Sequence, residues 1–212
     1  MRSLILAASV AGLTACAPLF AAPVALPAPA PAAAPVEALA PPPNTPASVA
    51  VLPASDIVTG QPYPSSCTLA KTPDGATLPD PACTPGAASD AVTQDNIKTT
   101  ICTKGFTATI RAPEPATSPV KRIAMRAYHE PATDIRTTEL DHLVPLELGG
   151  SNDVKNLWPE PSDEPGKGYA NTKDRVEGAL KTAVCAGKVP LSVARDLIAS
   201  DWTTAEQLAG LK

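Results

Sequence analysis

Residues 139–177 read ELDHLVPLELGGSNDVKNLWPEPSDEPGKGYANTKDRVE, and this stretch decides the fold that the sequence predicts. Residues 139–145 are typical of a strand, Gly149-Gly150 marks a turn, and residues 156–159 return as a second short strand. From residue 171 onward, apolar residues recur every four positions, which indicates an amphipathic helix. The stretch therefore predicts a β-hairpin followed by a helix, a frame on which short side chains converge.

Two side chains on this frame suit the hydrolysis of a phosphodiester bond. That reaction needs a base to deprotonate water, a divalent cation to stabilise negative charge, and a group that orients the base. His142 is the candidate base, because a neutral imidazole accepts a proton near pH 7. Asp141 offers a carboxylate oxygen, a hard ligand suited to Mg²⁺. Neighbours in a strand point to opposite faces, so both reach one site only through a bulge, a twist or a strand end.

The stretch resembles the HNH endonucleases, a family with a His-Asn-His or ββα-metal centre, and especially their small exported bacterial members. The resemblance covers about residues 83–202 and is specific as a set, whereas Asp-His alone is a weak motif. In chain order the matching residues are Thr93-Gln94-Asp95-Asn96-Ile97, Thr100-Ile101-Cys102, Asp141-His142, Pro145, Leu148-Gly149-Gly150, Asn156-Leu157-Trp158-Pro159, Lys173-Asp174, Glu177, Val184-Cys185-Ala186-Gly187 and Asp201-Trp202.

The resemblance implies catalytic and metal-binding roles. In that family the first His is the general base, the middle Asn fixes the hairpin loop and the orientation of the base, and the residue before the His binds metal. These roles fall on His142, Asn156 and Asp141. The last His, a metal ligand on the helix, corresponds to Asn171, whose amide oxygen favours one Mg²⁺ or Mn²⁺ over softer ions. A slip in the alignment here would move the ligand role to Asp174 or remove it.

Local basic residues are the candidate contacts for phosphate. The formal net charge of −4 excludes a strongly basic nucleic-acid binder, so a nuclease would depend on a local patch and its metal. The candidates are Arg111, Lys121, Arg122 and Lys173. For Lys121 and Arg122, which lie on a predicted helix, an ordinary solvated face is the alternative.

The rest of the domain is predicted to be built from short elements. His129 at a helix end, Trp158 and Trp202 favour structural roles. The expected elements are a short helix through residues 96–102 capped by Thr93 or Asp95, a strand over residues 106–111, a helix beginning at Ser118-Pro119, a helix over residues 171–186 ended by Gly187, a helix from Ser192, and a terminal helix with a capping box over residues 203–206.

The chain begins with features of an exported lipoprotein. Met1-Arg2 precedes an apolar run over residues 4–13 that is too short to span a bilayer. Leu13-Thr14-Ala15-Cys16 then resembles the bacterial lipobox, in which the Cys is lipidated. Cleavage after Ala22 is the alternative, and it is unfavourable because a proline would follow the cut. Residues 17–55 are rich in Pro and Ala without periodicity, which predicts a disordered linker.

The remaining cysteines indicate an oxidising compartment. Cys67, Cys83, Cys102 and Cys185 form an even set, which in an exported protein predicts two disulfides with three possible pairings. We favour Cys67–Cys83 as a local loop and Cys102–Cys185 as a long-range crosslink. The chain has no Cys-x-x-Cys motif, so a structural zinc site is the weaker interpretation.

These patterns predict an α+β protein in four parts: a lipoprotein signal peptide (1–16), a linker (17–55), a turn-rich disulfide loop (56–90) and a ββα-metal domain with additional short helices (91–212). The expected function is metal-dependent cleavage of DNA, or alternatively RNA, in the cell envelope or after secretion, with the lipid anchor in the membrane and no obligatory protein partner. Two alternatives are a surface module that lost catalysis at Asn171 and an exported phosphoesterase with another substrate.

Overall fold

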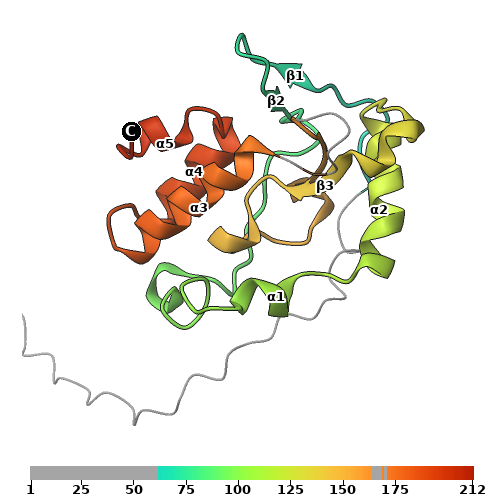
Figure 1. Ribbon diagram of the computed structural model, residues 1–212. Coiled ribbons are helices and arrows are strands. Elements are labelled where there is room, and N and C mark those ends of the chain that lie inside the picture. Colours follow the sequence, from blue (N-terminus) through green and yellow to red (C-terminus); the bar gives the residue numbers. More distant parts are fainter. Residues whose placement is uncertain (1–61, 164–168, 170) are drawn as a thin grey trace, which may run out of the picture. The chain divides into compact units, whose positions relative to one another are not determined.

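The computed structural model describes residues 62–163, 169 and 171–212 (Figure 1). The predicted lipobox Cys16 and the linker lie outside them. The elements are β1 (Ala70–Lys71), β2 (Thr77–Leu78), α1 (Phe106–Ile110), α2 (Glu114–Ala127), β3 (Thr138–His142), β4 (Leu157–Pro161), α3 (Thr172–Cys185), α4 (Leu191–Asp201) and α5 (Ala205–Leu208). This mixture of helices and short antiparallel hairpins confirms the α+β class. Within the described residues no helix has the length and apolarity needed to cross a bilayer.

The hairpin and helix predicted from residues 139–177 are present as β3, β4 and α3. β3 and β4 pair antiparallel, with Asp141 opposite Trp158 and His142 opposite Leu157. The chain between the strands approaches itself closely at Gly150, where a Cβ atom would lie 1.7 Å from the carbonyl oxygen of Val144. Only glycine fits there, because any side chain would overlap the backbone.

A core of apolar side chains lies between α3, α4 and the loops beside the hairpin. Val176, Leu180 and Val184 of α3 are buried in it, as their four-residue spacing predicts. Trp202 belongs to the same cluster and donates from Nε1 to the carbonyl oxygen of Thr77 at 2.9 Å, which confirms its structural role. The core therefore fixes α3, the helix that follows the hairpin.

The strand predicted over residues 106–111 is wrong, because Phe106–Ile110 forms the helix α1. Phe106 and Ile110 are both buried, and residues four apart share a face in a helix as well as in a strand. The threonines between them favoured a strand by propensity, and burial of the two apolar ends in the core outweighs that preference.

Three predicted helix starts also differ from the structure. α2 begins at Glu114, one turn before Ser118, with Pro119 inside the helix. The helix predicted through residues 96–102 is a 3₁₀ turn over Gln94–Asn96 followed by further turns, although Thr93 is its N-cap. The capping box of α5 does not form, because Glu206 instead accepts hydrogen bonds from Arg175.

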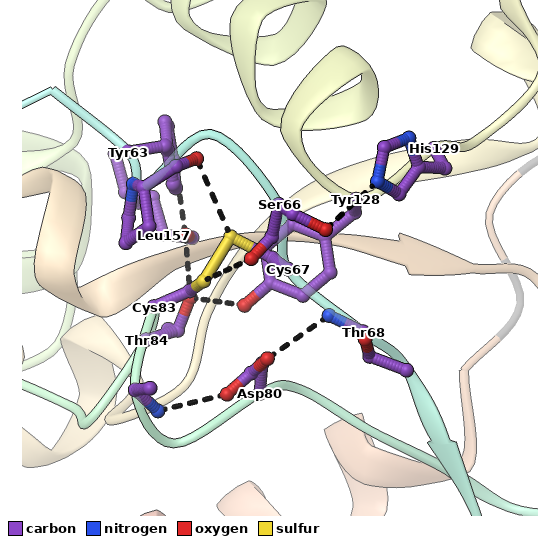
Figure 2. Close-up of a disulfide and its surroundings, with 12 residues drawn as sticks. Tyr63, Ser66, Cys67, Thr68, Asp80, Cys83, Thr84, Tyr128, His129 and Leu157 are labelled. Carbon is purple, nitrogen blue, oxygen red and sulfur yellow. Dashed lines mark hydrogen bonds between the residues drawn. A yellow bond between two sulfur atoms is a disulfide. The ribbon is translucent and has the colours of Figure 1, made fainter.

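Both favoured disulfides are confirmed. Cys67–Cys83 closes a separation of 16 residues, and Cys102–Cys185 closes one of 83. Two disulfides indicate an oxidising environment, as the cysteine count predicted. Figure 2 shows the first disulfide and its surroundings. The Cys67 amide donates to the carbonyl oxygen of Ala127, which fastens the turn-rich segment to the end of α2.

His129 lies just beyond the C-terminal end of α2. The residue has a left-handed backbone (φ 59°) directly after the helix, and its Nε2 lies 3.1 Å from the hydroxyl of Ser66 (Figure 2). Its exposed ring therefore contacts the turn-rich segment, in keeping with the structural role predicted for it.

We expect the two disulfides to stabilise the fold unequally. Replacing Cys102 and Cys185 with Ala should lower the free energy of unfolding by about 4–5 kcal/mol, and replacing Cys67 and Cys83 by about 3 kcal/mol, because the longer closed loop constrains the unfolded chain more. Urea unfolding of the two double variants measures the difference. Equal losses would contradict the assignment of Cys102–Cys185 as the dominant crosslink.

Candidate functional site

His142 is the last residue of β3 and is mostly buried. Its Nε2 lies 2.8 Å from Oδ1 of Asn152, and Nδ2 of Asn152 donates to the carbonyl oxygen of Ile110 at 2.9 Å. The second bond fixes the orientation of the Asn152 amide, so Oδ1 is the atom that meets the imidazole. Because this oxygen only accepts, Nε2 carries the proton of the neutral ring and Nδ1 is the basic nitrogen.

Electrostatics keep this imidazole neutral. Burial lowers the pKa of His142 from its ordinary value, and this effect outweighs the opposite influence of the Asn152 hydrogen bond and the Asp141 charge. A lowered pKa leaves the ring uncharged near pH 7. His142 is therefore a neutral base with its proton held on the nitrogen that faces Asn152.

Asn156 holds the loop that carries Asn152. Its side chain is fully buried and accepts from the amides of Val144 and Ala87 at 2.9 and 3.1 Å. Its Nδ2 donates to the carbonyl oxygens of Val144 and Ser151, both at 2.9 Å. Asn156 thus ties the connection between β3 and β4 to the turn-rich segment. The contact with the base falls to Asn152, which the sequence did not single out.

Asp141 is held in place by two donors. Trp158 Nε1 donates to its Oδ2 at 2.9 Å, and Nζ of Lys173 lies 2.8 Å from the same oxygen. Trp158 is fully buried, which confirms that it packs in the core. Asp141 and His142 nevertheless border one cavity, because β3 ends at His142 and the alternation of faces ends with it.

The cavity beside His142, here called the acidic cavity, has a volume of about 200 Å³. Its lining residues are Arg111, Glu139, Asp141, His142, Pro145, Leu146, Glu147, Asp174 and Glu177. Burial, followed by the charge of Asp141, raises the pKa of Glu139 to about 7 and also raises that of Asp174. These carboxylates repel one another in a partly buried space, and a cation would relieve that repulsion.

Lys173 supplies one cation from within the fold. Its side chain is fully buried, and Nζ donates to the carbonyl oxygen of His142 at 2.9 Å and contacts the carboxylates of Asp141 and Glu177. Burial alone would lower its pKa, but the charges of Asp141 and Glu177 outweigh burial and raise it. Lys173 is therefore a charged internal counter-ion. We do not retain it among the phosphate contacts, because its ammonium has no open side.

Asn171 lies at the N-cap of α3 without capping the helix. Its Nδ2 donates to Glu160 at 3.1 Å and to Glu139 at 3.4 Å, while its Oδ1 is buried with no hydrogen-bond partner among the described residues. Burial and then the charge of Asp141 raise the pKa of Glu160 well above its ordinary value, which favours the protonated form of this carboxyl. Asn171 does not line the acidic cavity, whereas Asp174 does.

The remaining candidate phosphate contacts divide into two groups. Arg111 lines the acidic cavity and also a second, adjoining cavity of about 440 Å³, and Lys121 lines the second alone. Arg122 lines neither of them. The structure therefore places Arg111 beside His142 and Lys121 further away on α2.

Comparisons with protein-family models, curated proteins and solved structures give no match to the chain. Among the described residues, no three His, Cys, Asp or Glu side chains are grouped as a ready metal site. The site is thus defined by its own geometry: a neutral base, an orienting amide, a set of carboxylates and one buried ammonium.

We expect Lys173→Met to lower the free energy of unfolding by about 3–5 kcal/mol, because it leaves Asp141 and Glu177 buried without their counter-ion. The loss should be larger at pH 8 than at pH 5, since burial raises the pKa of Glu177 and this carboxyl takes up a proton at the lower pH. Urea unfolding at the two pH values measures it. Lys181→Met on the same helix is the control and should cost less than about 1 kcal/mol, because its contact with Glu147 at 3.7 Å is partly exposed. Equal losses in the two variants would contradict the counter-ion role.

Proposed function

We propose that this protein is a metal-dependent nuclease that hydrolyses phosphodiester bonds of DNA or RNA outside the cytoplasm. The observation that carries the proposal is His142, a buried neutral imidazole whose basic nitrogen is selected by Asn152 and which borders a cavity of carboxylates with Arg111. The order of a β-hairpin and a helix, and the resemblance of their residues to HNH endonucleases, support the same conclusion.

The base acts through Nδ1 of His142. This nitrogen accepts a proton from the water that attacks phosphorus, and the ring becomes an imidazolium. Oδ1 of Asn152 continues to accept from Nε2–H, so it orients the ring before the transfer and stabilises the positive charge afterwards. Arg111 binds oxygens of the scissile phosphate from the border of the cavity.

Carboxylate oxygens line the acidic cavity and are the kind of ligand that one Mg²⁺ or Mn²⁺ takes, although no three of these side chains form a ready site among the described residues. In this proposal Asp141, through the oxygen that Lys173 and Trp158 do not use, and Asp174 would hold the ion, and Glu139 borders the same cavity. Asn171, the helical ligand that the resemblance implies, does not line this cavity, although its buried Oδ1 has no partner among the described residues. When bound, the ion stabilises negative charge on the phosphate and the leaving oxygen.

A binding module without catalysis is the second candidate function. Lys173 favours it, because its ammonium already pairs with Asp141 and Glu177, two of the residues that line the cavity. Under this alternative the acidic residues would be a structural cluster. Under both functions we propose that the protein works in the cell envelope or the medium, with Cys16 as the predicted lipid anchor. The two disulfides support this location, because they form in an oxidising compartment.

Cleavage of supercoiled plasmid separates the two functions. The purified full chain should nick the plasmid with Mg²⁺ or Mn²⁺ and not with EDTA. His142→Ala should reduce the rate by about 10²-fold or more, because the base is lost. His129→Ala, which changes the exposed second histidine, should keep the wild-type rate. Full activity in His142→Ala would refute the mechanism, and no cleavage by wild type of any DNA or RNA would favour the binding module.

Asn152→Ala should lower the nicking rate by about 10-fold or more, because the ring loses the group that orients it. The same hydrogen bond raises the pKa of His142, so its removal should also shift the acidic limb of the pH–rate profile to lower pH. Rates across pH 4.5 to 8.5, together with thermal unfolding to confirm the fold, measure both effects. A reduced rate with an unshifted profile would assign Asn152 to loop structure alone.

A further inference from the structure

The second cavity adjoins the acidic cavity and differs from it in chemistry. Arg111, Glu139 and His142 border both cavities, so the two meet at the candidate base. The rest of the second cavity combines apolar surface from Ala112 and Leu140 with hydroxyl groups from other residues. Its volume of about 440 Å³ falls within the range of roughly 300–1,000 Å³ for pockets that hold small ligands.

Tyr169 gives this cavity an aromatic wall. It is 53% exposed, although large aromatic side chains are usually mostly buried. Its hydroxyl accepts from Nζ of Lys121 at 2.7 Å, and Nζ lies 4.8 Å from the ring centroid. One ammonium covers at most one face of a ring, so at least the other face of Tyr169 is free of Lys121. An exposed ring held by a cation is a surface on which a nucleobase stacks.

The charges of the second cavity are local rather than uniform. Glu114 and Glu139 also border it, so the cavity as a whole does not attract anions. Arg111 lies where the two cavities meet, and Lys121 lies beside the aromatic wall. Arg111 and Lys121 therefore offer two separate contacts for phosphate, one at His142 and one beside the aromatic wall.

We propose that the second cavity binds one unpaired nucleotide next to the scissile phosphate, with its base stacked on Tyr169 and its outer phosphate on Lys121. This inference rests on the proposed nuclease function and specifies its substrate as single-stranded or locally unpaired nucleic acid. A paired base cannot use the site, because both of its faces are already stacked inside the duplex.

Binding tests this subsite without cleavage. Fluorescein-labelled oligothymidylate, oligouridylate and a thymidylate–adenylate duplex are titrated with the full chain in EDTA, and fluorescence anisotropy gives the affinities. At least one single strand should bind more tightly than the duplex. Tyr169→Ala should weaken single-strand binding roughly 5-fold or more, whereas Tyr169→Phe, which keeps the ring and loses only the hydroxyl contact with Lys121, should weaken it less. Lys121→Ala should weaken binding and reduce its salt dependence, and Arg122→Ala, one residue along α2, is the matched control.

Equal affinities of wild type and Tyr169→Ala, tighter binding of the duplex, or no binding of either single strand would overturn the subsite. Plasmid nicking by wild type together with any of these results refutes the subsite and leaves the nuclease standing. Binding that depends on Tyr169, together with a full chain that cuts no nucleic acid, supports the subsite and refutes the nuclease.

Discussion

The buried ammonium of Lys173 is the interaction on which the site depends. It joins α3 to the end of β3 by contacting Asp141, Glu177 and the carbonyl oxygen of His142. Removing such a charge from water is costly, and the cost is met only because carboxylates and a carbonyl surround it. The same contacts fix the carbonyl of the residue that carries the base. One cation therefore sets both the packing of helix on strand and the position of His142.

Two asparagines together fix the orientation of the His142 imidazole, one through the loop and one by direct contact. Asn156 makes four hydrogen bonds to backbone groups and thereby shapes the loop between β3 and β4. Asn152, which that loop carries, contacts the imidazole and is itself aligned by the carbonyl oxygen of Ile110 in α1. The base is thus linked to a helix far away in sequence. A displacement of Ile110 in α1 would therefore move the Asn152 amide that contacts the His142 imidazole.

The hairpin and α3 were predictable because each follows from a local pattern. The even count of cysteines predicted two disulfides and left three possible pairings, among which the structure decides. The strand predicted over residues 106–111 failed because Phe106 and Ile110 share a face in either conformation, and only the core decides between them. The role of Asn152 was not predictable, since its partner Ile110 is distant in sequence. Lys173 was taken for a phosphate contact because a sequence shows its charge and not its burial.

The distribution of charge explains why the proposed substrate contacts are few and local. The chain carries a formal net charge of −4, and the acidic cavity adds a concentrated negative field beside the base. A long polyanion would be repelled over most of such a surface. In the proposed subsite, a strand that presents one phosphate at Arg111 and another at Lys121 would meet cations at two points, while its base would gain stacking energy that does not depend on charge. On an acidic protein, the proposed stacking on Tyr169 would therefore contribute binding energy that a basic surface would otherwise have to supply.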